Sequence, residues 1–226
     1  MGSDITRRTI LMNTAAVGVG TAVAAAVPTG VATAAPSAGR PEKQPEKRPV
    51  SANGWEIEDR ADHISTVWTR PVSGTGLETA LRIGDVEAVL VHVIRRFHYE
   101  VERINTIDLA GWRKLGGTSR KRPESNLSSG TAVRIRPGAG AEDSYFPQQV
   151  LTIRDILADC EGTVRWGGDD EDVDESLYYV AVGPDSEALP RVAWKIREWN
   201  ATPGAGAGVI VDPSLPARRK RVQRYR

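Results

Sequence analysis

Apolar residues recur at steps of three and four along three stretches of the chain, and this spacing places them on one face of a helix. The pattern predicts three amphipathic helices, over Asp85 to about Ile104, Gln148–Cys160 and Ser186–Asn200. Polar and charged residues occupy most of the remaining positions. Each predicted helix therefore has one face suited to a core and one suited to solvent.

Short segments of alternating character lie between these predicted helices. They predict strands after Ala110-Gly111 and over Thr131–Ile135, Thr163–Trp166 and Leu177–Val182. The segments that connect them are rich in glycine and charge, so we interpret them as loops. The order helix, strand, strand, helix, strand, strand, helix predicts an α+β fold, with an antiparallel sheet flanked by helices.

The first 34 residues differ in composition from the rest of the chain. Arg7 and Arg8 precede a stretch rich in Ala, Val, Gly and Thr, which ends at Ala32-Thr33-Ala34. This arrangement is typical of a twin-arginine export signal, so we expect residues 1–34 to be cleaved and the mature protein to be secreted. The alternative is a membrane anchor, which the polar and proline residues of the stretch disfavour, so we expect no stable span after cleavage.

Composition divides the mature chain into three parts. Residues 35–53 are rich in proline and charge and predict an extended linker, whereas residues 54–208 hold the predicted elements and form the expected domain. Residues 209–226 end in six cations among nine residues, from Arg218 to Arg226, which predicts a disordered basic tail. Such a tail would bind anionic wall polymers or lipid headgroups rather than nucleic acid, or would only aid solubility.

Net charge, cysteine and histidine narrow the possible functions. The chain carries 30 Lys and Arg against 29 Asp and Glu, so binding must come from local patches. Cys160 is the single cysteine, and we expect it to be a small buried side chain without an internal disulfide. His92 and His98 lie about 600° apart around the predicted helix, unlike an i, i+4 metal pair, so we interpret both as surface or satisfied histidines.

A motif in the middle of the chain runs from Ser125 to Ile135. Its sequence, Ser-Asn-Leu-Ser-Ser-Gly-Thr-Ala-Val-Arg-Ile, resembles the S-x-H-x-x-G-x-A-x-D signature of the zinc D-Ala-D-Ala carboxypeptidases, in the VanY-like and endolysin branch of the hedgehog/DD-peptidase fold. Ser125 and Gly130 occupy family positions. Leu127 and Arg134 stand where the family has its first zinc histidine and its zinc aspartate.

Three further segments agree with this resemblance in their order along the chain. Trp166–Asp170 is similar to the family's W-G-G-D-W, and Asp174–Tyr179 is similar to the D-P-M-H-F-E that follows it. Upstream, Gly111-Trp112-Arg113 resembles the family's G-Y-R. The resemblance covers roughly residues 85–182 and implies a degenerate relative of these enzymes.

Carried over by position, the resemblance assigns a role to several further residues. Arg113 would orient the substrate, Asp174 would stand at the general base, and Leu177 would replace the third zinc ligand. Leucine has no lone pair to donate and arginine stays protonated, so the chain is expected to bind no zinc and to use no cofactor.

The loss of all three ligands also predicts what fills their place. We expect the guanidinium of Arg134 to replace the positive charge of the metal and to pair with Asp174 or Asp169. We expect Leu127 and Leu177 to pack against each other.

Six acidic residues crowd the segment from Asp169 to Glu175. Carboxylates are ligands that Ca²⁺ prefers, but the segment lacks the glycine and glutamate that an EF-hand loop needs at its sixth and twelfth positions. A solvated loop is the simpler interpretation.

These observations favour a secreted, catalytically inactive D-Ala-D-Ala carboxypeptidase-like protein that binds peptidoglycan or a wall-associated partner. In that reading, Arg113 and Arg134 present cations to a terminal carboxylate. The candidate binding residues are Arg113, Ser125, Arg134, Asp169, Asp174 and Tyr179, with Asp174 as the candidate catalytic group.

Two other readings stay open. One is a zinc-independent hydrolase or lyase that acts on cell-wall peptides in the same cleft, with Asp169, Asp174, Tyr178 and Tyr179 as acid–base groups. The other is a purely structural partner protein, whose cleft is filled by its own side chains.

Overall fold

The computed structural model describes residues 48–207, 209 and 211–225. The chain divides into two units, Met1–Gln44 and Pro45–Arg226, and all the described residues belong to the second. The predicted export signal and most of the predicted linker lie outside the described residues.

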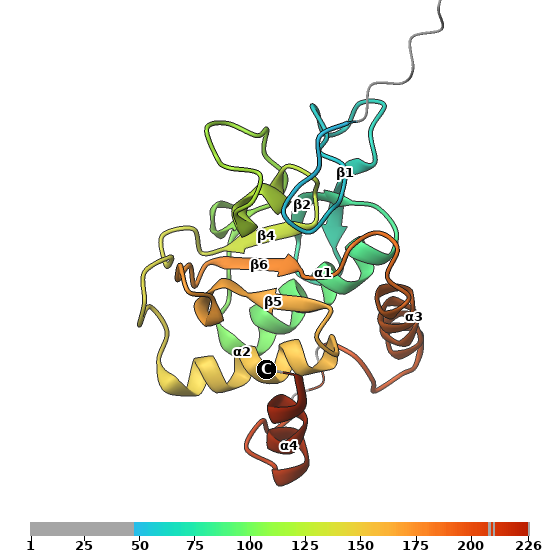
Figure 1. Ribbon diagram of the computed structural model, residues 1–226. Helices are drawn as coiled ribbons and strands as arrows, with labels where there is room; N and C mark the ends of the chain where they lie inside the picture. The colour runs from blue at the N-terminus through green and yellow to red at the C-terminus, as the bar shows by residue number, and fades with distance from the viewer. Residues whose placement is uncertain (1–47, 208, 210, 226) are drawn as a thin grey trace, which may run out of the picture. The chain divides into compact units, whose positions relative to one another are not determined.

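The centre of this unit is a four-stranded sheet with the strand order β3-β4-β6-β5 (Figure 1). Every neighbouring pair is antiparallel. The strands are short, and their bounds are Leu109–Ala110 for β3, Ala132–Ile135 for β4, Val164–Trp166 for β5 and Leu177–Val180 for β6. The α+β fold with an antiparallel sheet flanked by helices is therefore confirmed.

Three helices follow the apolar stripes of the sequence. α1 spans Asp85–Arg96, α2 spans Pro147–Asp159 and α3 spans Ala188–Ala201. A π-helical turn, Phe97–Val101, continues α1, so regular helix ends earlier than the predicted Ile104. Figure 1 shows α1 behind the sheet and α2 along its β5 edge. Single turns of 3₁₀-helix occur at Thr106–Asp108, Pro123–Leu127 and Gly167–Asp169.

The main core lies between the sheet and the helices. Leu90 and Ile94 of α1 are fully buried in the same cluster as Val133 of β4 and Tyr178 of β6. Burial of each such side chain stabilises the fold by roughly 1.5–3 kcal/mol relative to exposure. Cys160 is buried in this cluster as a free thiol, which confirms its predicted role.

A separate hairpin was missed by the sequence pattern. β1, Val67–Val72, pairs antiparallel with β2, Leu77–Arg82. In β1 only the first and last residues are buried, and the four between them are exposed. The alternation that marks a half-buried strand is therefore absent from β1.

Most of the predicted basic tail is helical rather than disordered. Residues Pro216–Tyr225 form a helix, α4, which packs against α2. Arg218 and Arg221 supply the reason, because they form ion pairs with Asp155 and Asp159 of α2.

The end of the predicted linker also belongs to the fold. The N–H of Ala52 donates to Ser125 Oγ at 2.9 Å, and the Asn53 amide donates to the carbonyl of Val180 at 2.8 Å. Residues 48–53 are therefore part of the domain. Within the described part of the chain, no helix is both long and apolar enough to cross a bilayer.

Candidate functional site

The three positions that the resemblance assigns to metal ligands lie together in space. Arg134 of β4 is paired in register with Leu177, the first residue of β6. Leu127 ends the 3₁₀ turn that precedes β4, and it shares a buried cluster with Leu177, Ala132 and Tyr179. The prediction that the two leucines pack into one cluster is confirmed.

The Arg134 guanidinium occupies the polar side of this cluster. Its Nη1 lies 2.6 Å from Asp174 Oδ2 and donates to Ser176 Oγ at 2.8 Å. Its Nη2 donates to Glu124 Oε1 at 2.7 Å. The predicted pair with Asp174 is therefore present, whereas Asp169 pairs with Arg154 instead.

Asp174 is held in place from both sides of its carboxylate. Its Oδ1 accepts a hydrogen bond from the hydroxyl of Ser176 at 2.6 Å and another from the Ser176 N–H at 3.2 Å. Gly167 allows the backbone of Asp174 to approach, because a Cβ at that position would overlap the Asp174 carbonyl oxygen. The glycine pair of the Trp-Gly-Gly-Asp segment thus has a steric role: a Cβ on Gly168 would overlap the ring of Trp166.

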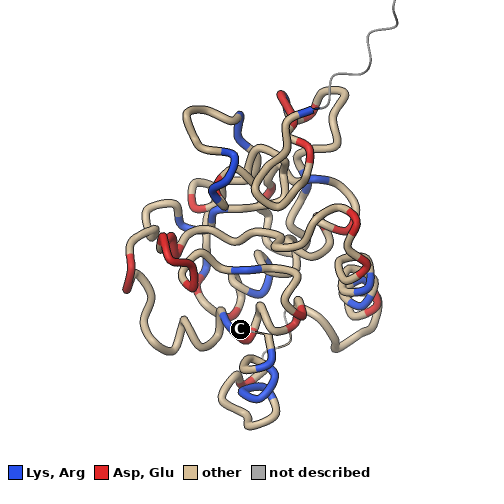
Figure 2. Tube along the Cα trace, viewed as in Figure 1, with Lys and Arg blue, Asp and Glu red and all other residues tan. Residues whose placement is uncertain are grey.

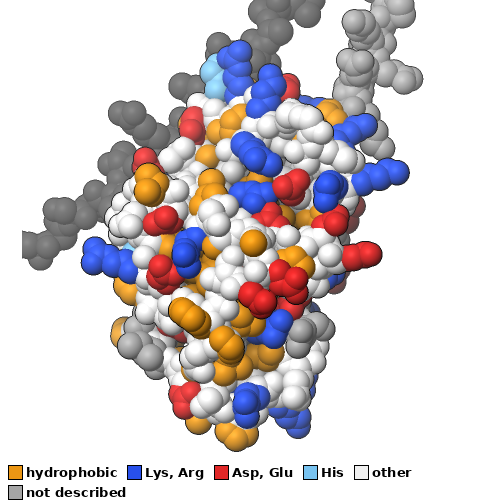
Figure 3. Space-filling view, turned by 90° about the vertical axis from the view of Figure 1, so that its left-hand side faces the viewer, with side chains coloured by type: hydrophobic (Ala, Val, Ile, Leu, Met, Phe, Trp, Pro, Cys, Tyr) orange, Lys and Arg blue, Asp and Glu red, His pale blue; other side chains and the backbone are white. Residues whose placement is uncertain are grey.

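The acidic segment is neutralised by basic residues rather than simply solvated. Besides the pair of Asp169 with Arg154, Asp170 pairs with Arg165 at 3.0 Å, and Asp172 pairs with Arg122 at 2.7 Å. Figure 2 marks this segment as a concentration of acidic positions, and Figure 3 shows acidic and basic side chains interspersed on the face of the molecule that carries it. Among the described residues, no group of three or more His, Cys, Asp or Glu side chains could hold a metal ion.

An open cavity of about 260 Å³ lies beside the Arg134–Asp174 pair. Glu124, Asp170, Asp172 and Asp174 contribute four carboxylates to its lining, against the two guanidinium groups of Arg122 and Arg134. The remaining lining residues are Pro123, Gly140, Gly167, Val173 and Leu177. Each of these carboxylates pairs with an arginine, and Asp170 pairs with Arg165 outside the lining. Four carboxylates against these three guanidinium groups leave the walls with an excess of one negative charge.

Four of the six predicted binding residues do not line this cavity: Arg113, Ser125, Asp169 and Tyr179. Arg113 is exposed on the loop after β3. Ser125 is fully buried, and its hydroxyl donates to the carbonyl of Arg120. Asp169 lines a different cavity, between α2, β5 and α4. A sequence motif fixes the order of these residues but not the distances between them.

The two tyrosines of the alternative reading are engaged elsewhere. Tyr178 is buried in the main core, and burial raises its pKa well above the ordinary value. The Tyr179 hydroxyl donates to Asp170 Oδ2 at 2.8 Å, and burial together with this contact raises its pKa.

A second polar site, which the sequence did not predict, lies between α1, α2 and α4. Its carboxylates are Glu100, Asp155 and Asp159, and its guanidinium groups are those of Arg96, Arg218 and Arg221. The available signal was helical spacing: Arg96 and Glu100, and Asp155 and Asp159, are each four residues apart, and Arg218 and Arg221 are three apart.

His92 borders this second site, and His98 does not. His92 is buried, with its Nε2 3.4 Å from Asp159 Oδ2, and burial lowers its pKa. A surface position is therefore wrong for His92. His98 Nδ1 accepts a hydrogen bond from the N–H of Ile104 at 3.3 Å.

The residues at the carried-over ligand positions do not fit zinc. Leu127 and Leu177 have no donor atom and form part of a buried apolar cluster. Arg134 is a cation already bound by two carboxylates. A second cation at this point would be repelled by the guanidinium and would find no ligand from the leucines.

Comparisons of the chain with protein-family models, with curated proteins and with solved structures find no match.

Proposed function

We propose that the chain is a non-catalytic relative of the zinc D-Ala-D-Ala carboxypeptidases, exported from the cell, and that it binds peptidoglycan peptides at the cavity beside Arg134. One observation carries the proposal. Leu127, Arg134 and Leu177, which a motif alignment alone assigned to one metal site, lie together, and Arg134 pairs with the carboxylate assigned to the general base.

The geometry favours binding over catalysis. A general base needs an accessible oxygen aimed at the proton that it removes. Both oxygens of Asp174 already accept from Arg134 and Ser176. Tyr178 and Tyr179, the acid–base groups of the hydrolase or lyase alternative, are engaged in the core and with Asp170. That alternative gains no support from this arrangement.

The charge of the cavity revises the kind of ligand group expected. Arg134 already pairs with two carboxylates, those of Glu124 and Asp174, and Arg113 does not line the cavity, so neither residue offers an unpaired cation to a terminal carboxylate there. Carboxylates outnumber guanidinium groups on the walls. We therefore propose that the cavity takes a peptide through a free amine, the group that an excess of carboxylates favours.

Binding of the full chain to purified peptidoglycan tests this function. Asp172 lines the cavity with its side chain 79% exposed, so Asp172→Lys should leave the fold intact. We expect it to weaken binding about tenfold, equivalent to ~1.4 kcal/mol. The matched control is Asp185→Lys, at an exposed site outside the cavity lining. Equal affinities for the two variants would contradict peptide binding at this cavity.

A further inference from the structure

α4 is held against the domain in a different way from the other helices. α1, α2 and α3 each bury several side chains, whereas α4 buries none. Three cavities, of about 420, 790 and 230 Å³, are lined in part by α4 residues. The surface beneath α4 is therefore incompletely filled, and apolar packing contributes little to its attachment.

The strongest contacts between α4 and the rest of the domain are ionic. Arg218 donates to both oxygens of Asp155, at 2.6 Å in each case, and Arg221 donates to Asp159 Oδ1 at 2.6 Å. Bidentate guanidinium–carboxylate contacts of this kind are among the stronger polar interactions in proteins. Asp155 and Asp159 are buried, so these contacts are less screened by salt than surface pairs.

The body keeps a partner for both carboxylates without α4. Arg96 of α1 lies 3.0 Å from Asp155 Oδ2 and 2.6 Å from Asp159 Oδ2. Departure of α4 would open this site to water while Arg96 stays in contact with both acids. Arg96 would then face three carboxylates, because it also pairs with Glu100, and the water that enters the opened site would solvate the excess negative charge.

The outward side of α4 carries unused charge. The helix has five described cations and no acid, and two of the cations face α2. Arg219, Lys220 and Arg224 are exposed, and the structure shows no ion pair for them within its described residues. Figure 2 shows that basic positions predominate along α4. With α4 on the surface of α2, two of its five cations form ion pairs. A partner with closely spaced anionic groups could form ion pairs with all five.

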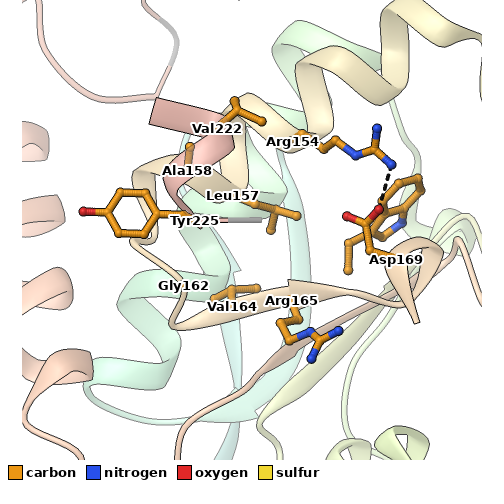
Figure 4. A pocket seen from close by; sticks show the side chains of 10 residues that line it. Arg154, Leu157, Ala158, Gly162, Val164, Arg165, Asp169, Val222 and Tyr225 are labelled. Atoms are coloured by element: carbon orange, nitrogen blue, oxygen red, sulfur yellow. Dashed lines mark hydrogen bonds and ion pairs between the residues drawn. The ribbon is translucent and has the colours of Figure 1, made fainter. Parts of the chain in front are cut away.

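The groove beneath α4 has an apolar floor. The cavity between α2, β5 and α4 is lined by Leu157 and Val164 of the body and by Val222 and Tyr225 of α4, with the Arg154–Asp169 pair at its rim (Figure 4). Departure of α4 would remove one wall of this cavity and expose that floor.

We propose that α4 is a detachable basic arm: it docks on Asp155 and Asp159 in the free protein and leaves them to bind a linear polyanion, which uncovers the groove between α2 and β5. This inference is independent of peptide binding at the Arg134 cavity. A polymer fits better than a membrane, because Val222 and Tyr225 are the only large apolar side chains in α4, too few for insertion into lipid.

Affinity of the full chain for inorganic polyphosphate tests the proposal. If docking on α2 competes with the polymer, loss of the two carboxylates should strengthen polymer binding. We expect Asp155→Asn with Asp159→Asn to bind at least about tenfold more tightly than Asp185→Asn with Glu187→Gln, which removes the same charge from two exposed sites. Equal affinities for the two double variants would overturn detachment.

Two further binding measurements test the role of α4 and the choice of a polymer as its partner. Substitution of the outward cations, Arg219→Gln, Lys220→Gln and Arg224→Gln, should weaken polyphosphate binding at least tenfold, and an unchanged affinity would overturn the role of α4. Stronger binding to vesicles of phosphatidylglycerol and phosphatidylcholine than to polyphosphate would overturn the choice of a polymer. If the buried double variant does not fold by circular dichroism, Asp159→Asn alone provides the comparison with Asp185→Asn.

Discussion

Arg134 joins three segments of the chain through charge-assisted hydrogen bonds. It reaches Glu124 before β4, Asp174 after the acidic segment, and Ser176 at the start of β6. The side chains of Arg134 and Asp174 are 15% and 18% exposed, so their interaction is only partly screened by water. Its removal should therefore cost more than the removal of a surface pair.

We expect Arg134→Met to lower the free energy of unfolding by about 2 kcal/mol, because it leaves Asp174 and Glu124 close together without their cation. Arg134→Met combined with Asp174→Asn should cost less than the sum of the two single substitutions. Urea denaturation measures these values. The control is Arg136→Met, which breaks a more exposed pair with Glu102 and should cost less than about 1 kcal/mol. Equal costs at the two arginines would contradict a special role for Arg134.

Individual residues of the resembled motif differ in how well their positions could be predicted. The contacts of Arg134 with Asp174 and of Leu127 with Leu177 followed from the alignment, because a metal site requires its ligands to converge. The positions of Arg113 and Ser125 did not follow. Arg113 is exposed on the loop after β3. Ser125 is buried, and its hydroxyl accepts from the N–H of Ala52 and donates to the carbonyl of Arg120.

At the scale of elements, burial pattern decided which parts of the fold were predictable. In α1, α2 and α3 the apolar residues recur with the 3.6-residue period of a helix, so the sequence alone predicts these helices. α4 has no such apolar pattern, because arginines face α2, and composition alone therefore indicated disorder. The ion pairs between α4 and α2 could be recognised only from the structure, because α1, α2 and α4 are far apart in the sequence.

The ionic site between these helices predicts a loss of stability in acid. Burial alone would raise the pKa of Asp159, but the neighbouring His92, Arg96 and Arg221 outweigh burial and lower it to about 2. A lowered carboxyl pKa stabilises the fold above the unfolded value near 4, by roughly 2 kcal/mol, and this contribution disappears as the pH falls towards 2. Burial lowers the pKa of His92, so its contribution is present above about 6.5 and declines below it.

Urea unfolding at pH 7, 5 and 3 measures both effects. We expect the free energy of unfolding to fall between pH 7 and 5 and to fall further at pH 3. In His92→Gln, the first decrease should be smaller and the second should persist. A decrease between pH 7 and 5 that is the same in both proteins would contradict the assignment to His92.

At the scale of the whole molecule, the proposed function requires an export signal in residues 1–34 and a binding domain after it. The charges of the chain nearly cancel, and the described domain concentrates acids at the Arg134 cavity and cations on α4. We therefore expect any charged partner to bind through one of these two local patches of opposite sign, since the net charge is close to zero.

Export by the twin-arginine route predicts a dependence on Arg7 and Arg8. Substitution of both by lysine keeps the positive charge but removes the motif, and we expect the protein to accumulate inside the cell in its uncleaved form. Cell fractionation with an N-terminal sequence of the secreted protein measures this. Secretion of the Lys–Lys variant at the wild-type level would contradict the predicted route.

We propose that the arginine–carboxylate pair of Arg134 and Asp174, beside Leu127 and Leu177, stands in place of a metal site. The zinc content of the purified chain tests it, in the wild type and in the triple variant Leu127→His, Arg134→Asp and Leu177→His, which restores the three ligand types of the resembled signature. With folding checked by circular dichroism, we predict no stoichiometric zinc in the wild type and one zinc per chain in the triple variant. Stoichiometric zinc in the wild type, or a folded triple variant that binds none, would contradict the claim.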